Sequence, residues 1–233
     1  MINYPLNKLL FFDIETVGIA ANYSELQQQN PDLAYLFEVY YDWFKKRFNE
    51  DSHLSIEDMF YQKSALVTEF SKIVCASFSF IDHENKKRKQ SFSSKDEKEL
   101  LLGVQSLLNR VEPLGFVLCG HNIKNFDIPV VSKRMVINGL LPPKILPSYD
   151  TKPWDIKALD TKDIWQFGQF GSIGSLELMC LSLGVPSSKT SEVTGNKVHK
   201  AYWEEDQLEA ITKYCEQDVD VLIDVVTKLK ELK

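Results

Sequence analysis

The sequence predicts an α/β domain built on a mixed β-sheet, and three observations support this prediction. Residues 8–14 form a short, nearly continuous apolar run, which is typical of a central strand covered on both faces. Strand-like segments come first, and strands and helices then alternate along the chain. The 233 residues, without internal repeats or low-complexity tracts, suffice for one large domain or two small ones. The single alternating pattern favours one domain spanning residues 1–233.

The segment 20–65 interrupts the strand pattern that begins at residue 8. Its apolar residues recur at three- and four-residue steps, which indicates an amphipathic helix. The residues of this stripe are Leu33, Leu36, Phe37, Tyr40, Tyr41, Phe44 and Phe48. We interpret the segment as a helical insertion. Because it follows the first strand directly, it either shapes the cleft beside that strand, adds to the core or presents a surface to a partner.

The next two predicted strands form a hairpin. Ile73–Phe80 is apolar, whereas Lys87–Ser93 is polar and has the character of an edge strand. The basic run Lys86–Lys89 lies at this hairpin. Most such runs are solvated edges, and contact with nucleic acid is the less common alternative.

The second half of the chain alternates helices with strands. Ser94 or Asp96 is a suitable N-cap for a helix that continues to about Arg110. Gly184 is a suitable end for a later helix. The elements expected after Arg110 are a strand at Gly115–Cys119, a helix at Asp127–Asn138, a strand near Ile156–Asp160, a helix at Ser175–Leu183, a polar loop at 185–203 and a final helix at Asp206–Leu232.

The composition is that of a soluble globular protein, with 44% hydrophobic and 26% charged residues. We find no apolar stretch long enough to cross a bilayer and no N-terminal signal segment, so we expect a cytoplasmic protein without a membrane partner. The four cysteines are far apart in the sequence, which favours reduced core thiols over disulfides or a zinc site. The net charge of −6 argues against a general nucleic-acid coating protein but allows a local, metal-bearing cleft.

Asp13 and Glu15 follow the first apolar run and are the first candidate functional residues. Alternate residues of a strand point to the same face, so the two carboxylates project together and repel each other. A divalent cation would neutralise them, and hard oxygen ligands of this kind suit Mg²⁺ or Mn²⁺. Taken alone the pair is weak evidence for a metal, because many acidic pairs simply end a strand in solvent.

Two further acidic positions lie at places where a site can form. Tyr214 and Asp218 are four residues apart on the last helix, along or next to its apolar stripe. A carboxylate there is costly unless it is paired, hydrogen-bonded or bound to metal. Asp127 follows a predicted strand, and strand ends are where α/β sheets gather functional groups. Simple capping of the following helix is the alternative for Asp127.

Together these motifs resemble the exonuclease motifs of the DEDD superfamily. They are Asp13-Ile14-Glu15-Thr16, then Asn122 with Phe126-Asp127, then Tyr214 with Asp218. Tyr214 corresponds to the tyrosine-bearing branch, since the histidine-bearing branch would place His where Lys213 stands. The wider sequence resembles predicted 3′–5′ exonucleases related to the proofreading domain of family-B DNA polymerases. The resemblance covers nearly the whole chain and implies a ribonuclease-H-like fold.

The resemblance also implies a two-metal-ion phosphodiesterase that uses Mg²⁺ or Mn²⁺. In that scheme Asp13 bridges the two ions, Glu15 and Asp218 complete the first site, and Asp127 supports the second, partly through water. Tyr214 positions the attacking water, because a phenol is too weak a base to activate it alone near neutral pH.

Three residues near these motifs are candidates for substrate binding. Thr16 would contact the terminal nucleotide through its hydroxyl or backbone N–H, with a turn or helix cap as the alternative. Asn122 matches a family position near the terminal sugar and base. Phe126 is a candidate for base contact, although packing in the core is the more frequent fate of such a ring. His121 is interpreted as a structural hydrogen-bonding residue.

Aromatic and basic residues in the second half are secondary candidates for contact with nucleic acid. The aromatic ones are Trp154, Trp165, Phe167 and Phe170, and the basic ones are Lys189, Lys197 and Lys200. The aromatic rings would stack on bases, and the lysines would bind phosphates. Packing against the sheet and a solvated loop are the alternatives. Asp160 is interpreted as a structural residue at a strand end rather than a ligand.

We therefore expect a metal-dependent 3′–5′ exonuclease that releases nucleoside 5′-monophosphates from the 3′ end of single-stranded DNA. Trimming of RNA is the first alternative. A non-catalytic module that holds 3′ ends is the second, although four mutually repelling carboxylates argue against it. A ribonuclease-H-like endonuclease is disfavoured by the pair Tyr214 and Asp218. The remaining length holds no polymerase domain, so a polymerase or repair partner would act in trans.

Overall fold

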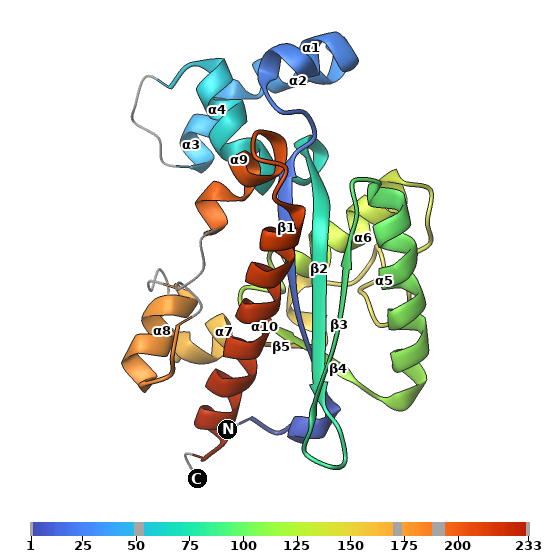
Figure 1. The fold of residues 1–233 in the computed structure, drawn as a ribbon, viewed down its shortest axis with the longest axis vertical. Coiled ribbons are helices and arrows are strands. Elements are labelled where there is room, and N and C mark those ends of the chain that lie inside the picture. The colour runs from blue at the N-terminus through green and yellow to red at the C-terminus, as the bar shows by residue number, and fades with distance from the viewer. Residues whose placement is uncertain (1, 49–53, 170–173, 188–193, 232–233) are drawn as a thin grey trace.

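The computed structural model describes residues 2–48, 54–169, 174–187 and 194–231. Its centre is a five-stranded sheet in the order β3-β2-β1-β4-β5 (Figure 1). β1 pairs antiparallel with β2 and parallel with β4, so the sheet is mixed, as predicted. The strands are β1 (Leu9–Gly18), β2 (Ser71–Ile81), β3 (Lys87–Ser93), β4 (Val117–Gly120) and β5 (Ala158–Asp160).

Helices cover both faces of this sheet. α10 (Leu208–Glu231) lies along β1 and β2 on one face, and α5 (Glu97–Val111) and α6 (Asp127–Ile137) pack on the other (Figure 1). The side chains of β1 alternate between these layers. Leu9 and Phe11 pack with residues of α10, whereas Leu10 and Phe12 pack with residues of α5 and α6. The alternation therefore turns Asp13 and Glu15 toward α10.

β1 is longer than the expected strand at 8–14 and continues through both carboxylates to Gly18. Its pairing with β2 shifts between Glu15 and Thr16, where β2 contributes the extra residue Val74. The acidic pair does not end the strand because the antiparallel pairing with β2 continues past it. The pair thus lies in the middle of a strand rather than at its solvent-exposed end.

In the described part of the segment between β1 and β2, four α-helices replace the single expected one. They are α1 (Tyr23–Gln29), α2 (Pro31–Val39), α3 (Tyr41–Arg47) and α4 (Ile56–Lys63). The expected helix breaks at Tyr40. In a continuous helix Phe37 and Phe44 would lie about 10 Å apart along the axis. The break brings their ring centroids to 4.8 Å, and both rings pack edge-on against Phe70.

The remaining helices agree with the expected ones in most places. Asp96, one of the two predicted N-cap residues, caps α5, and α8 (Leu176–Leu183) begins directly after its N-cap Ser175, close to the expected start. The polar segment 185–203 contains an unexpected helix, α9 (Val198–Trp203), because Val198, Ala201 and Tyr202 are buried against the α10 side of the sheet. The short helix α7 (Thr161–Gln166) is a second element that the sequence pattern does not indicate. All four cysteines are free and buried, as expected. Among the described residues, no helix has the length and apolar character to span a bilayer.

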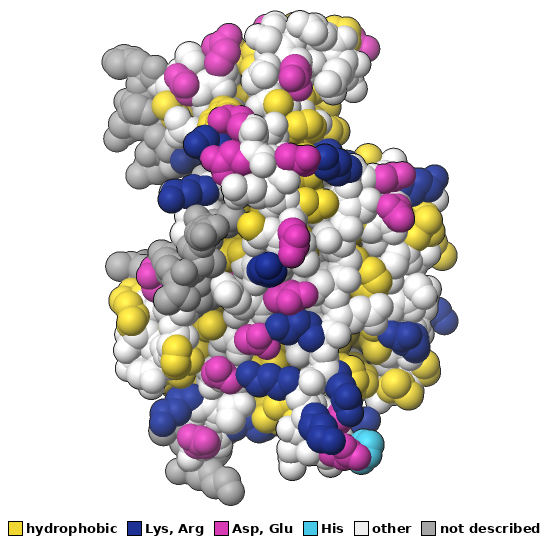
Figure 2. Space-filling model, viewed as in Figure 1, with side chains coloured by type: hydrophobic (Ala, Val, Ile, Leu, Met, Phe, Trp, Pro, Cys, Tyr) yellow, Lys and Arg dark blue, Asp and Glu magenta, His cyan; other side chains and the backbone are white. Residues whose placement is uncertain are grey.

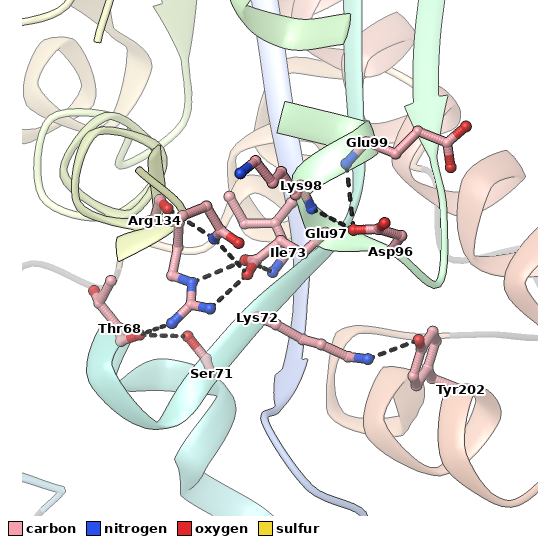
Figure 3. A network of polar contacts seen from close by, with 11 residues as sticks. Thr68, Ser71, Lys72, Ile73, Asp96, Glu97, Lys98, Glu99, Arg134 and Tyr202 are labelled. Carbon is pink, nitrogen blue, oxygen red and sulfur yellow. Dashed lines mark hydrogen bonds and ion pairs between the residues drawn. The ribbon is translucent and has the colours of Figure 1, made fainter. Parts of the chain in front are cut away.

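A buried ion pair between Glu97 and Arg134 fastens α6 to the rest of the fold (Figure 3). The Glu97 carboxylate accepts hydrogen bonds from Arg134 Nε at 2.8 Å and from the Ile73 backbone N–H at 2.7 Å. It also accepts one from Asn138 Nδ2 at 2.9 Å, and Arg134 Nη1 donates to the Thr68 carbonyl at 3.3 Å. These contacts satisfy both buried charges and connect α5, α6 and the start of β2.

The pair predicts a large stability effect of Arg134→Met. Because this change leaves the Glu97 charge buried without its partner, we expect a loss of about 3–5 kcal/mol in the free energy of unfolding. Urea denaturation measures the loss. Lys133→Met is the matched control, since it removes only the solvent-exposed pair with Glu69 and should cost about 0–1 kcal/mol. Equal losses in the two variants would contradict the structural role of the buried pair.

Candidate active site

Three carboxylates from two elements meet between β1 and α10. Asp13 and Glu15 project from β1, and Asp218 projects from the facing side of α10. One oxygen from each of the three side chains lies within 4.8 Å of the others, and all three residues are partly exposed. The structure therefore brings together three of the four predicted acids.

The electrostatics of this group favour a bound cation. Burial, followed by repulsion from Asp127, Glu15 and Asp218, raises the pKa of Asp13 well above its usual range. Burial, followed by repulsion from Asp218, likewise raises the pKa of Glu15. A divalent ion would relieve this repulsion, and carboxylate oxygens are the donors that Mg²⁺ and Mn²⁺ prefer. The donor set thus fits a hard divalent metal.

Asp127 approaches the group from the opposite layer of the fold. It is the first residue of α6 and is buried, and its Oδ1 accepts the Ile14 backbone N–H at 3.2 Å. The pairing of β1 with β4 ends at Phe11 and Cys119, which leaves the Ile14 N–H available. Burial raises the pKa of Asp127 to about 7. The α6 N-cap position is Phe126 and has no side-chain cap, so the Asp127 carboxylate is directed to β1 rather than used as a simple helix cap.

Tyr214 lies one turn before Asp218 on α10 and is largely buried. Burial, repulsion from the nearby acids and a hydrogen bond to Asp218 raise the pKa of its hydroxyl far above the ordinary value. The raised pKa favours the protonated hydroxyl, which hydrogen-bonds to Asp218. A Cβ built on Gly195 would stand 3.8 Å from the Tyr214 oxygen, so the turn Gly195–Lys197 passes close to this hydroxyl.

Cys215 is a neighbour of the site that the sequence interpretation does not single out. Its thiol lies 3.5 Å from Asp13 Oδ2 and 3.4 Å from the Asp13 carbonyl oxygen. Cys215 belongs to the apolar stripe of α10. Its position directly after Tyr214 is the sequence feature that could have indicated its place beside the site. The hydrogen bond from the thiol offsets a small part of the increase in the pKa of Asp13 that burial and repulsion cause.

Asp160 organises the loop that leads to Asp127. Its carboxylate accepts the backbone N–H groups of Asn122 at 2.8 Å and Lys124 at 3.1 Å. Asn122 has a left-handed backbone (φ 61°), which these bonds hold in place. The Asn122 side-chain oxygen accepts Lys162 Nζ at 3.0 Å. Asp160 is thus the structural strand-end residue expected from the sequence, with a specific role in shaping the loop.

The other predicted contact residues occupy different environments. The Thr16 hydroxyl donates to the Ala65 carbonyl at 2.8 Å, which gives it a structural role beside the acids. Phe126 is half-buried against the core on the α5 and α6 side. His121 contacts Thr161 Oγ1 and the Gly174 carbonyl, consistent with the structural role expected for it.

The secondary candidates have different environments, and two of them lie outside the described residues. Trp154 and Phe167 are strongly exposed, whereas Trp165 packs beside α8 and α10. Lys200 pairs with Glu205 at 3.0 Å, and Lys197 is exposed. Phe170 and Lys189 lie outside the described residues.

Acidic residues of α10 pair with the basic run at the β2–β3 hairpin. Lys87 contacts Asp224 at 3.1 Å, and Lys89 contacts Asp220 at 2.7 Å. Figure 2 shows the resulting interleaving of basic and acidic side chains over α10 and β3. This pairing supports the interpretation of the run as a solvated edge.

Two comparisons, with a protein-family profile and with a solved structure, gave matches to exonuclease-related and polymerase proteins. Residues 63–223 match the profile of a family described as predicted 3′–5′ exonucleases related to the exonuclease domain of PolB. The fold is similar to that of the family B DNA polymerase from the hyperthermophilic archaeon Pyrobaculum calidifontis, with a TM-score of 0.57 and 17% sequence identity. That likeness confirms the expected ribonuclease-H-like fold. A comparison with curated proteins gave no match.

The extent of these matches differs along the chain. The structural match covers 97% of this chain but 25% of the polymerase, so the chain spans about a quarter of the length of that protein. The family match begins at Lys63 and includes Asp127, Tyr214 and Asp218. β1 with Asp13 and Glu15, and the helices α1 to α3, precede the matched range.

The repulsion among the acids predicts opposite effects of Asp218→Asn with and without metal. In EDTA the variant should unfold at a higher temperature than the wild type, because one of three mutually repelling negative charges is removed. With Mn²⁺ at about 100-fold its Kd, the wild type should gain about 2.7 kcal/mol, and the variant should lose most of this gain. Thermal unfolding by circular dichroism measures both effects.

Asp224→Asn is the matched control for this experiment. Asp224 lies on the same helix but is half-exposed and pairs with Lys87. It should respond to Mn²⁺ as the wild type does. A metal response that survives Asp218→Asn unchanged would exclude Asp218 as a ligand.

Proposed function

Because the chain belongs to the family of predicted 3′–5′ exonucleases related to the exonuclease domain of PolB, we propose that it hydrolyses single-stranded DNA from the 3′ end. The products are nucleoside 5′-monophosphates. The observation that carries the proposal is the meeting of Asp13, Glu15 and Asp218 within 4.8 Å, with Tyr214 hydrogen-bonded to Asp218. Asp127 completes the set through its position beside Ile14.

Four carboxylates would hold the divalent ions in this proposal. Asp13, Glu15 and Asp218 form the site for one ion, and Asp13 with Asp127 contributes to a second. Bound Mg²⁺ or Mn²⁺ would stabilise charge on the phosphate and the leaving oxygen and favour ionisation of the attacking water. The repulsion among the acids supports the proposal, since a cation would compensate it.

The groups of the chain position the substrate and water. The Tyr214 hydroxyl keeps its proton because its pKa is raised, so it orients the water by hydrogen bonding and does not remove a proton from it. Asp218 fixes this hydroxyl one turn away on the same helix. Asn122 lies at the start of the loop before Asp127, where it would contact the terminal sugar and base. Phe126 would border the same nucleotide, and Thr16 would reach it through its backbone or the free lone pairs of its hydroxyl.

DNA is the proposed substrate because the related exonuclease domain belongs to a DNA polymerase family. RNA remains the alternative substrate for the same residues. Matched DNA and RNA oligonucleotides of one sequence discriminate the two by their kcat/KM values. A polymerase or repair protein is the proposed partner that supplies the 3′ end.

Asp13→Ala should reduce nucleotide release from a 3′-labelled oligonucleotide by about 10³-fold or more, because charge stabilisation by metal contributes several kcal/mol to the barrier. Excess EDTA should abolish release in the wild type, and added Mn²⁺ should restore it. Product chromatography identifies the 5′-monophosphates. Undiminished release by Asp13→Ala would show that the acids are not the catalytic site.

Tyr214→Phe should retain measurable activity. It removes one hydrogen bond near charged groups, worth about 1.5–3 kcal/mol, which corresponds to a decrease in kcat of about 10- to 150-fold. The loss should be the same across neutral pH, because the hydroxyl does not titrate there. Tyr149→Phe, on a fully exposed tyrosine, is the control and should leave kcat unchanged. A pH-dependent loss in Tyr214→Phe would instead indicate proton transfer by the phenol.

A further inference from the structure

A groove of about 350 Å³ separates the helices that follow β1 from the start of α6. One wall is α3 together with residues 66–69, and the other is the end of the Asn122 loop with the first turns of α6. The side chains that line it include Trp43, Arg47, Leu66, Phe126, Pro129 and Lys133.

Both walls of the groove begin beside the acidic site. Asn125 and Phe126 line it, and the next residue is Asp127. On the other wall, Leu66 follows Ala65, whose carbonyl accepts the Thr16 hydroxyl directly after Glu15. A polymer chain with its end at the acids can therefore continue into the groove.

Trp43 supplies an aromatic surface for a base. Its indole is half-exposed and packs edge-on against Phe44 at 5.4 Å, and Phe44 is buried in the core of the four helices. The Arg47 guanidinium lies over the Trp43 ring at 5.2 Å from the centroid. Indole rings and guanidinium planes are the groups on which proteins stack unpaired bases.

The groove also carries positive charge in a protein that is negative overall. The last turn of α3 contains Lys45, Lys46 and Arg47, of which Arg47 lines the groove. Lys133 lines the other wall and pairs with Glu69 of the first wall at 2.8 Å, so these two charges cancel and Arg47 leaves a net positive charge. The positive charge of Arg47 would attract backbone phosphates that the acidic site repels.

We propose that this groove binds the nucleotides of single-stranded DNA that precede the 3′-terminal residue, with one base stacked on Trp43 and the backbone phosphates beside Arg47 and Lys133. This assignment rests on the proposed exonuclease function and adds a subsite to it. α3 precedes the part of the chain that matches the family profile, whereas the wall formed by α6 lies within it. Of the three roles considered for the segment 20–65, the proposed subsite favours shaping of the cleft.

The test compares a dinucleotide with an oligonucleotide of about ten nucleotides, a length within the range of single-strand binding sites. Trp43→Ala should raise KM for the long substrate by about 5- to 150-fold, the loss expected for one stacked base. Its kcat and its activity on the dinucleotide should stay at the wild-type level. Trp43→Phe, which keeps a ring, should recover part of the loss, and Arg47→Ala should reduce the salt dependence of binding.

Tyr35→Ala is the matched control. Tyr35 is an exposed aromatic residue on α2 of the same helical segment but does not line the groove. It should leave both substrates unaffected. Circular dichroism spectra and melting temperatures should show that the Trp43 and Tyr35 variants fold alike.

Binding without cleavage separates the subsite from the nuclease function. Fluorescence anisotropy of the labelled oligonucleotide, measured in the Asp218→Asn background, should show the same weakening with Trp43→Ala. If the wild type degrades no oligonucleotide but Trp43→Ala still weakens binding, the nuclease function fails and the subsite stands. Equal binding by Trp43→Ala and Tyr35→Ala, equal losses on long and short substrates, or a Trp43-dependent dimer without an effect on DNA binding would each overturn the subsite.

Discussion

Three carboxylates whose oxygens lie within 4.8 Å of one another repel strongly in a partly buried setting, and the surrounding structure holds them there. Two of them belong to β1, which lies in the middle of the sheet and is paired on both sides. The third belongs to α10, whose apolar residues pack on the same face. The free energy of core packing therefore offsets a repulsion that a bound divalent cation would relieve.

The fourth acid depends on the opposite layer of the fold. Asp127 reaches β1 only because β4 stops pairing at Cys119 and leaves the Ile14 N–H free to donate. Asp160 shapes the loop that precedes Asp127. The ion pair of Glu97 and Arg134 holds α6, the helix that begins at Asp127, against α5. Two buried polar arrangements thus support the position of the Asp127 carboxylate, a candidate metal ligand.

The helices between β1 and β2 lie almost entirely before the part of the chain that matches the family profile. Their aromatic core fixes α3 against Phe70, and this packing places Trp43 and Arg47 opposite the start of α6. A groove is formed between a segment outside the family match and one inside it.

Local periodicity is sufficient to predict most elements and part of the site. The period of two in β1 places Asp13 and Glu15 on one face, and the spacing of four in α10 places Tyr214 beside Asp218. These are properties of a strand or helix by itself, so the sequence determined them. The order of the motifs along the chain can likewise be read without the three-dimensional structure, and it indicates the same family as the profile match. The break at Tyr40 and the helix α9 escape prediction because they result from packing against distant residues.

Only the tertiary structure decided which residues meet across the layers. Asp218 lies beside Asp13 because α10 packs over β1, and the Asp127 carboxylate is directed to Ile14 instead of acting as a simple helix cap because a backbone donor is free there. The partners of Glu97 and the groove beside Trp43 are likewise contacts between segments far apart in the sequence. Such contacts follow from how layers pack and which polar groups remain unpaired, and no local pattern encodes either.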